Sequence, residues 1–323
     1  MVVEGDEFLD ATFAELPRFL RAGDLLVLNE TRVIAARLRG TRLPGGGRAE
    51  LLLLQPATAP RYDPAATRWL ALAKPGRRLR AGTRIAFGEA GEANVVRALD
   101  GGVREVEFAL REPFEVFLER AGRLPLPPYI RTESPDAQRR YQTVFARVPG
   151  SVAAPTASLH FTPDLLERLG THGIEIARIV LDVGLGTFRP ISADRIDDHV
   201  MHAEAYAIPA EAAEAVECAR ARGRRIVAAG TTVVRALEGC AAAHHGRIVA
   251  GEGRTDLFIT PGFAFQVVDA MVTNFHLPQS SLLVLVSAFA GRERILRAYG
   301  AAVARRYRFF SFGDAMLLAR ACV

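Results

Sequence analysis

The sequence predicts an α/β protein with a mixed-sheet α/β body and an inserted small β-barrel. Between residues 33 and 112, short strand-like runs alternate with turn signals such as PGGG (44–47), which is typical of hairpins. From Tyr141 onward, strand and helix patterns alternate, which is typical of an α/β layer. We therefore expect an α/β domain of residues 1–32 and 113–323 around an inserted β-barrel domain of residues 33–112.

The expected elements follow from short patterns along the chain. Six strands are expected in the barrel, at 33–40, 48–55, 68–73, 83–88, 93–99 and 104–110, and a short helix at 112–122. In the α/β part, Thr162 is an expected N-cap with Pro163 at the first helical position. Further helices are expected at 209–223, 231–243, 280–291 and 292–306, with strands at 174–184, 224–230 and 267–275.

The composition indicates a globular protein that is not embedded in a membrane. Hydrophobic residues make up 50% of the 323 residues and charged residues 24%. Apolar runs such as 281–291 are far shorter than the roughly 20 residues that cross a bilayer, and no leader pattern opens the chain. We expect a cytoplasmic protein. Cys218, Cys240 and Cys322 form no CxxC pair, so neither a metal clamp nor a redox couple is expected.

The charge is mildly basic, with a formal net charge of +5 and a pI near 9.5. Lys74 is the only lysine among 41 basic residues. Arginine forks suit phosphate oxygens, so this balance is compatible with a nucleic-acid partner without requiring one.

Five of the seven histidines lie beside polar residues at expected element ends: His160, His199, His202, His244 and His276. His199, His202 and Glu204 form an HxxHxE pattern, but the spacing differs from the helical HExxH zinc site, so no metal is expected. Each histidine on its own is better explained by a structural role in bracing the backbone near a loop end. Together they indicate acid-base chemistry, because imidazole changes charge near pH 7.

Three segments carry the candidate site. In 227–238 (VAAGTTVVRALE), a strand leads through glycine into a helix. The N-terminus of this helix, together with the hydroxyls of Thr231 and Thr232, would attract a carboxylate or phosphate. Ordinary N-capping explains the two threonines equally well. In 272–281, Asn274 and His276 follow a strand, where α/β proteins tend to hold ligands. The third, GSVAAPTASLHFTPDLL (150–166), sets small residues ahead of a histidine.

The GxG in 183–190 is followed by Pro190 rather than by a helix, so a Rossmann fingerprint is disfavoured.

Ten ordered motifs resemble one known family. They are GDLLVLNETRVIAARL, LPLPPYI, YQTVFA, GSVAAPTASLHFT, VGLGTFRPI, HVMHAEAY, AAGTTVVRALE, TDLFITPGF, TNFHLPQSSLL and YRFFSFGDAML. From Gly23 onward the chain resembles the S-adenosylmethionine:tRNA ribosyltransferase-isomerase family of queuosine biosynthesis. The resemblance implies an α/β domain with an inserted β-barrel. It also implies a transferase that moves and isomerises the ribosyl group of S-adenosylmethionine onto 7-aminomethyl-7-deazaguanine at the tRNA wobble position, giving epoxyqueuosine, adenine and methionine.

The resemblance suggests roles for the candidate residues. His160 and His276 are the expected proton-transfer groups, with His202 and Glu204 as the competing pair. The methionine carboxylate or a tRNA phosphate would be held by Asn29, Thr31, Arg32 and Arg235, while Ser151 and Thr156 offer hydroxyls in the segment of small residues. Tyr129, Tyr141 and Phe145 are candidate platforms for a splayed base of the anticodon loop. S-adenosylmethionine is then a consumed substrate, no cofactor is expected, and the protein is expected to act as a monomer.

The chain departs from the family pattern in two places that bear on these roles. A segment that ends in an Arg-Leu pair is expected ahead of the Gly23 motif, and here the chain opens with MVVEG; loss of a segment that lines the site would impair activity. Asp182 stands where many relatives have His, so a histidine there is dispensable. An RNA-binding module without catalysis and an ordinary methyltransferase remain the alternatives, although the latter lacks its glycine-rich strand-to-helix turn.

Overall fold

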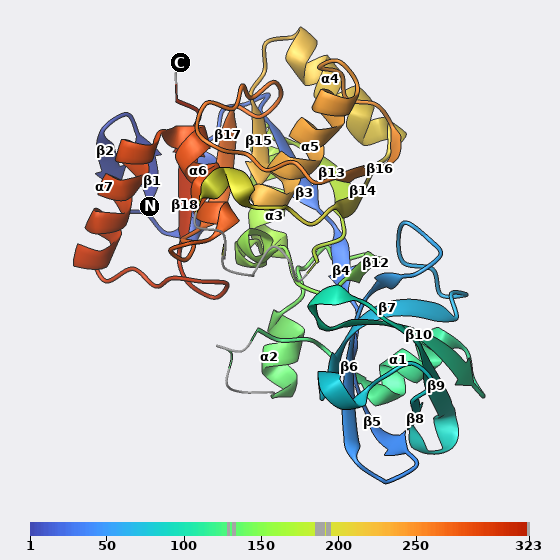
Figure 1. The fold of residues 1–323 in the computed structure, drawn as a ribbon. Helices are drawn as coiled ribbons and strands as arrows, with labels where there is room; N and C mark the ends of the chain where they lie inside the picture. Colours follow the sequence, from blue (N-terminus) through green and yellow to red (C-terminus); the bar gives the residue numbers. More distant parts are fainter. Residues whose placement is uncertain (128–129, 131–133, 185–190, 192–194, 322–323) are drawn as a thin grey trace. The chain divides into compact units, whose positions relative to one another are not determined.

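In the computed structural model, which describes residues 1–127, 130, 134–184, 191 and 195–321, the chain divides into two units. The α/β unit comprises Met1–Thr31, Tyr141–Val148 and Ala154–Val323, and the barrel unit comprises Arg32–Arg140 and Pro149–Ala153. The predicted fold class is confirmed (Figure 1). The barrel unit is larger than the predicted range 33–112, in part because the helix after it packs its aromatic residues against the aromatic residues of the barrel.

A nine-stranded mixed sheet forms the α/β unit, in the order β16-β14-β13-β3-β15-β17-β18-β1-β2. Its strands are β1 (Val2–Glu4), β2 (Glu7–Leu9), β3 (Leu25–Asn29), β13 (Glu175–Leu181), β14 (Glu204–Ile208), β15 (Ile226–Ala229), β16 (Gly251–Thr255), β17 (Ala270–Asn274) and β18 (Ala315–Ala319). The four central strands, β13, β3, β15 and β17, are parallel to one another. Because both faces of a central parallel strand are covered, β3 and β15 are buried along their whole length.

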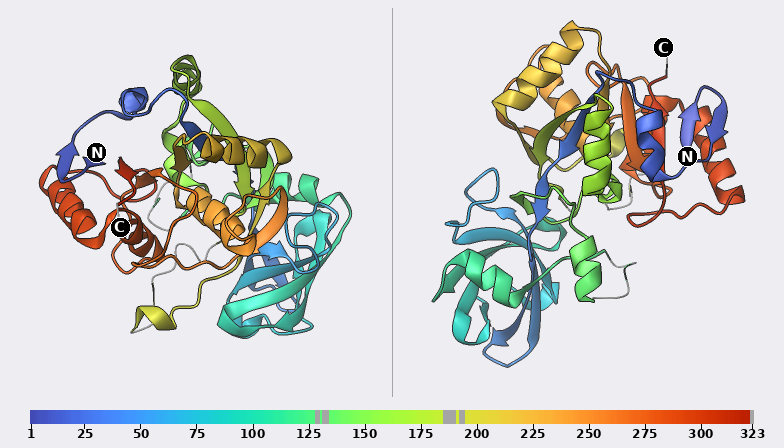
Figure 2. Two further views of the ribbon diagram at one scale, coloured as in Figure 1. Left: turned by 90° about the horizontal axis from the view of Figure 1, so that it is seen from above. Right: turned by 180° about the vertical axis from the view of Figure 1, so that it is seen from behind.

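Helices cover both faces of this sheet. They are α3 (Pro163–Thr171), α4 (Ala210–Ala221), α5 (Thr231–Ala243), α6 (Ser281–Ala290) and α7 (Arg292–Ala304), with 3-10 segments η1 (Phe13–Arg18), η5 (Thr156–His160) and η7 (Ile196–Asp198). The views in Figure 2 place α3 and η1 on one face and α5 on the other. On the α3 side, alternate residues such as Leu26, Leu28, Val227 and Val272 join Leu165 in one buried cluster.

The helix boundaries confirm the capping signals of the sequence. The Thr162 hydroxyl accepts from the Leu165 N–H at 3.2 Å with Pro163 in the first turn, and Ser280 caps α6 in the same way through Leu283. The helix predicted at 231–243 is α5. The short strands β1, β2, β14 and β16 were not predicted. None of the described helices is both long and apolar enough to span a bilayer.

The barrel unit contains six strands that close into a barrel, in the order β5-β6-β7-β10-β9-β8 with β8 pairing back to β5. They are β5 (Arg37–Leu43), β6 (Arg48–Pro56), β7 (Arg68–Lys74), β8 (Arg84–Ala86), β9 (Gly91–Ala98) and β10 (Val103–Leu110). The unit also holds α1 (Phe114–Ala121), β11 (Gly122–Arg123), α2 (Pro135–Arg140), η2 (Gly76–Arg78), η3 (Gly88–Ala90) and η4 (Asp100–Gly102). A separate two-stranded sheet pairs β4 (Thr31–Val33) with β12 (Val148–Ser151).

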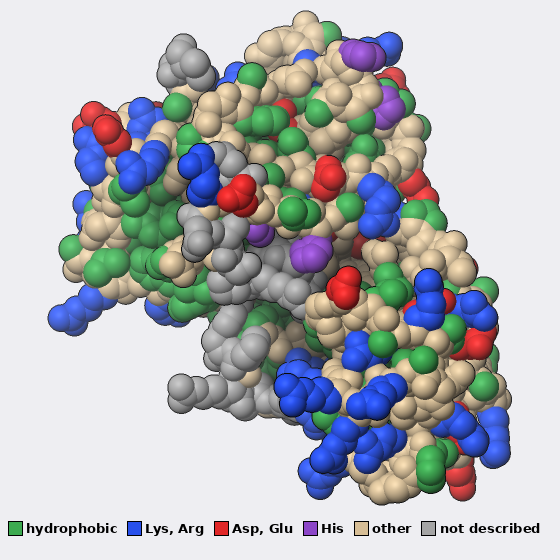
Figure 3. Space-filling view, in the orientation of Figure 1, with side chains coloured by type: hydrophobic (Ala, Val, Ile, Leu, Met, Phe, Trp, Pro, Cys, Tyr) green, Lys and Arg blue, Asp and Glu red, His purple; other side chains and the backbone are tan. Residues whose placement is uncertain are grey.

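Barrel closure depends on a glycine at the point where β5 meets β8. A Cβ atom on Gly40 would lie 2.6 Å from Ile85 Cγ2 and 2.8 Å from the Ala86 carbonyl oxygen. The interior is filled by alternating apolar residues, such as Leu38 and Leu51, and by Phe117 from α1. Outside, Lys and Arg side chains gather over the β5 and β6 end of the barrel (Figure 3).

We predict that Gly40→Ala destabilises the protein by about 1–3 kcal/mol, because the added methyl group overpacks the closure of the barrel. Gly170→Ala in α3 is the matched control, since a Cβ there meets nothing within 4 Å. It should be neutral or stabilise by about 0.5–1 kcal/mol. Urea unfolding of both variants measures the difference; equal stabilities would contradict the closure argument.

Candidate active site

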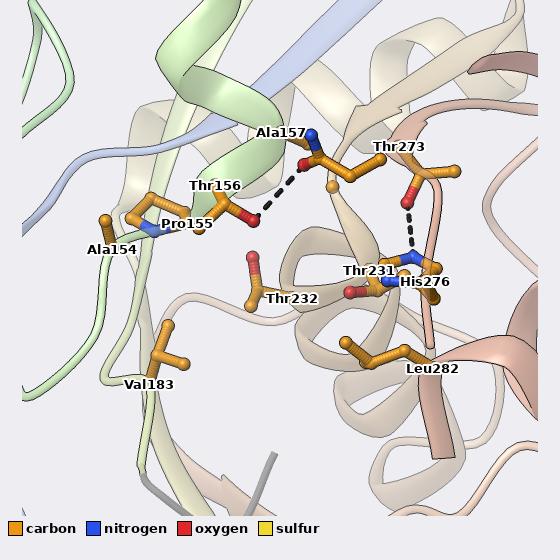
Figure 4. A pocket seen from close by; sticks show the side chains of 12 residues that line it. Ala154, Pro155, Thr156, Ala157, Val183, Thr231, Thr232, Thr273, His276 and Leu282 are labelled. Atoms are coloured by element: carbon orange, nitrogen blue, oxygen red, sulfur yellow. Dashed lines mark hydrogen bonds between the residues drawn. The ribbon is translucent and has the colours of Figure 1, made fainter. Parts of the chain in front are cut away.

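A small cavity lies at the carboxyl ends of β15 and β17, beside the N-terminus of α5 (Figure 4). Its volume is about 30 Å³. The segments predicted to carry the site all reach it, and its lining is Ala154, Pro155, Thr156, Ala157, Val183, Gly230, Thr231, Thr232, Thr273, Asn274, His276 and Leu282. The parallel arrangement of β15 and β17 brings their ends to one edge of the sheet. Thr156, which lies 118 positions before Asn274 in the sequence, reaches the same cavity.

The N-terminus of α5 faces this cavity without a side-chain cap. Its N-cap, Gly230, has φ of 100°, a conformation that glycine adopts without strain. The Gly230 N–H donates to the Val272 carbonyl at 2.8 Å, which fixes the end of β15 against β17. Thr231 and Thr232 follow at once and line the cavity. The free N–H groups and the helix dipole therefore favour an anionic or electron-rich group at this end.

Asn274 connects the two predicted segments of the site. The Thr156 hydroxyl donates to Asn274 Oδ1 at 3.2 Å, and Asn274 Nδ2 lies 3.1 Å from His160 Nε2. Because the amide oxygen is engaged by Thr156, the amide nitrogen donates to His160, whose Nε2 must then be unprotonated. His160 also stacks on Phe13 with ring centroids 4.9 Å apart. Burial lowers the pKa of His160, against a smaller opposing effect of the Asp314 carboxylate, so the ring is neutral near pH 7.

His276 follows the end of the same strand, two positions after Asn274. Its Nε2 is 2.8 Å from the Thr273 hydroxyl oxygen, and its backbone N–H donates to the Tyr299 hydroxyl oxygen at 2.7 Å (Figure 4 shows the Thr273 contact). Burial lowers the pKa of His276 to about 3. The ring is therefore also neutral near pH 7.

Asn29 and Thr31 fix the end of β3 rather than line the cavity. The Asn29 amide donates to the Leu181 carbonyl at 3.0 Å and accepts from the Leu181 N–H at 3.1 Å. The amide nitrogen also lies 3.5 Å from the hydroxyl oxygen of Thr232, which lines the cavity. The Thr31 hydroxyl donates to Asp182 Oδ1 at 3.1 Å.

Arg235 and Glu204 form a buried ion pair away from the cavity lining. Arg235 is 2% exposed and Glu204 4%, and the guanidinium also donates to the Thr255 and Leu257 carbonyl groups. Glu204 accepts a further hydrogen bond from the Gly184 N–H at 2.9 Å. This pair ties α5 to β14 and β16, so neither side chain points its polar atoms at the small cavity.

The remaining predicted residues lie outside the cavity lining. His202 is exposed just before β14. Arg32 and Ser151 belong to the barrel unit, the first exposed and the second buried. Tyr141 is fully buried and Phe145 packs partly against the core, whereas Tyr129 lies outside the described residues, as does most of the GxG segment. Among the described residues no cluster of His, Cys, Asp and Glu could hold a metal ion.

Sequence reasoning missed several residues of the site. Thr273 lies three positions before His276 in the motif TNFHLPQSSLL, and the turn after β17 brings its hydroxyl to the imidazole ring. Phe13 and Asp314 reach His160 from the two ends of the chain, and no local pattern signals that proximity.

Comparison with known proteins agrees with the motifs. A family model described as "Queuosine biosynthesis protein" matches residues 1–318. A relative from Moorella thermoacetica, named S-adenosylmethionine:tRNA ribosyltransferase-isomerase, is 55% identical over 308 residues, which cover 95% of this chain and 87% of the relative. A relative of the same name from Anaeromyxobacter sp. is 53% identical over 311 residues, 96% of this chain and 88% of the relative. The crystal structure of the S-adenosylmethionine tRNA ribosyltransferase of Thermotoga maritima matches with a TM-score of 0.51 and 35% identity, over 98% of this chain and 90% of that one.

We predict that Arg235→Met costs about 3–5 kcal/mol of stability, because it leaves the buried Glu204 carboxylate without its partner. The double variant Glu204→Gln with Arg235→Met should lose clearly less, since no uncompensated charge remains. Urea unfolding of both variants measures this. Equal losses in the single and double variants would show that packing, rather than charge, dominates.

We predict that His276 makes the folded protein less stable in acid. Its folded-state pKa lies below the ordinary value near 6.5, so the unfolded chain binds the additional proton as pH falls from about 6.5 toward about 3, and this contribution to stability is lost over that window. His276→Gln should therefore show a flatter loss of stability between about pH 7 and about pH 4.5. The exposed His202→Gln is the control and should keep the wild-type profile. Parallel profiles for wild type and His276→Gln would refute the linkage.

Proposed function

This chain belongs to the queuosine biosynthesis protein family of S-adenosylmethionine:tRNA ribosyltransferase-isomerases, and from that premise we propose that His160 and His276 carry its proton transfers. The reaction transfers and isomerises the ribosyl group of S-adenosylmethionine onto 7-aminomethyl-7-deazaguanine at the tRNA wobble position, with release of adenine and methionine. The single observation that supports this assignment is that both histidines meet the end of β17, one through Asn274 and the other through Thr273.

The protonation states of the two rings suit a cationic substrate. The sulfonium of S-adenosylmethionine carries a positive charge, and two neutral imidazoles add no like charge beside it. The same sulfonium acidifies the adjacent 5′ hydrogens of the ribose. A neutral ring that accepts one of these protons becomes an imidazolium, which is the acid that the departing adenine requires. The base step therefore comes first, and each transfer contributes ~10² to 10⁴-fold.

The surrounding residues bind and orient the reacting groups. A cavity of about 30 Å³ has room for a group of about the size of a water molecule, so it receives one end of the ligand rather than the whole nucleoside. The uncapped N–H groups of α5 and the hydroxyls of Thr231 and Thr232 offer donors to the methionine carboxylate or to electron-rich ring atoms. Small residues from Ala154 to Ala157 let the backbone approach the ligand closely.

S-adenosylmethionine is a consumed substrate in this proposal, and no resident cofactor takes part. The tRNA presents its anticodon loop, whose bases can be splayed out for modification. The protein works in the cytoplasm, where tRNA is modified. We propose that it acts as a monomer.

We predict that His160→Ala and His276→Ala each lower adenine release by at least about tenfold while the fold stays intact. Purified variants are incubated with S-adenosylmethionine and precursor tRNA, and adenine is quantified by chromatography. His202→Ala tests the competing pair and should retain near-normal turnover. A large loss in His202→Ala with near-normal turnover in the other two variants would transfer the roles to His202 and Glu204.

A further inference from the structure

The positive charge of the protein is concentrated in the barrel unit. This unit contains 20 Lys and Arg and 12 Asp and Glu, a net charge of +8. The whole chain carries +5, so the α/β unit carries a net charge of −3. The candidate catalytic residues belong to the α/β unit, so ribosyl transfer itself does not account for the excess of positive charge in the barrel unit.

Within the barrel, five basic side chains share one end, which we call the basic rim: Arg42, Arg48, Lys74, Arg77 and Arg78. The strand registers place them together. Leu43, at the end of β5, pairs with Arg84 at the start of β8, while Thr41 pairs with Arg48 at the start of β6. Lys74, at the end of β7, pairs with Glu50, and η2 follows immediately. Figure 3 shows Lys and Arg side chains gathered over this end of the barrel.

The five cations of the rim differ in their pairing from several other arginines of the barrel surface. Arg68 and Arg84, for example, are exposed and have carboxylate partners, Glu107 at 2.9 Å and Glu92 at 2.7 Å. Among the described residues, none of the five rim cations forms an ion pair with a carboxylate. Their charge is therefore available to an external anion.

A hollow of about 960 Å³ lies beside the rim and includes two of its cations, Arg48 and Lys74. Thr41 and the half-buried Phe87 also line it. Glu50 lies in the same hollow, but its carboxylate is 3.4 Å from Arg39, so it is already compensated. The hollow thus combines cations with a hydroxyl and an aromatic edge, and it is large enough for a nucleotide.

We propose that the basic rim and its hollow bind the ribose-phosphate backbone of the tRNA substrate, with residues distinct from those of the catalytic cavity. This inference rests on the proposed function only for the identity of the RNA. The planar guanidinium group of arginine can donate two hydrogen bonds to a pair of phosphate oxygens. Cations without a carboxylate partner release counterions from the RNA when they bind its phosphates. Such contacts carry little sequence information, so they anchor the RNA while the α/β unit acts on the modified nucleotide.

The test is the double variant Arg48→Ala with Lys74→Ala, in which both side chains are exposed and outside the barrel core. At about 0.1 M salt the dissociation constant for precursor tRNA should rise about tenfold. The logarithm of the association constant should also fall less steeply with the logarithm of the salt concentration, by about 1 to 2 in slope, because roughly 0.7–0.9 counterion is released per phosphate contact. The double variant Arg222→Ala with Arg292→Ala removes the same charge from exposed positions of the α/β unit and should leave tRNA binding within about twofold of wild type.

Adenine release at saturating tRNA should be normal in both double variants, and thermal melting checks that both are folded. Unchanged binding and salt slope in Arg48→Ala with Lys74→Ala, or an equal loss in the control pair, overturns the assignment of the rim. Failure of the proposed function has a different signature, since wild-type protein would then release no adenine from S-adenosylmethionine and precursor tRNA.

Discussion

The side-chain amide of Asn274 is the contact on which the candidate site depends. It occupies the last position of β17, is 2% exposed, and bonds both Thr156 and His160 from a 3-10 segment more than a hundred residues earlier. An amide has a donor end and an acceptor end, so its orientation determines which nitrogen of His160 carries the proton. Asn274 thus sets both the position of the His160 ring and the nitrogen that carries its proton.

The parallel strands and their covering helices provide the rigid frame for this contact. β3, β15 and β17 end at one edge of the sheet, and Gly230 lets the chain turn there directly into α5. The buried pair of Arg235 and Glu204 holds α5 against β14 and β16 from the far side. Such a buried pair gives little net stability, but it leaves one arrangement in which every charge has a partner. The site is therefore positioned by elements that cannot shift independently.

Much of this architecture follows from local patterns in the sequence. The caps at Thr162 and Ser280 and the glycine before α5 mark real helix starts, and PGGG (44–47) marks the real hairpin of β5 and β6. The rule for strand ends indicated a ligand site at 272–281, and the structure brings the other two site segments to the same cavity. Arg235 shows what local patterns cannot predict. An arginine near the start of a helix is typical of an anion-binding site, but only the tertiary structure shows that the Arg235 guanidinium already pairs with the Glu204 carboxylate.

The short elements β1, β2, β14 and β16 escaped prediction for a related reason. Three to five residues carry too little periodicity, and their pairing is decided by distant partners such as β18. Phe13 and Asp314 belong to the same class, since they approach His160 only after both ends of the chain have joined the unit. The pKa values of the two histidines depend on burial and could not be read from the motifs that contain them.

The closure of the barrel through β5 and β8 has an evolutionary consequence. A sheet without open edges satisfies its own backbone groups, so its outward-facing side chains are free to diverge while the scaffold persists. If the basic rim binds RNA as we propose, the RNA that it recognises can be changed on this surface, one arginine at a time, while the barrel itself persists.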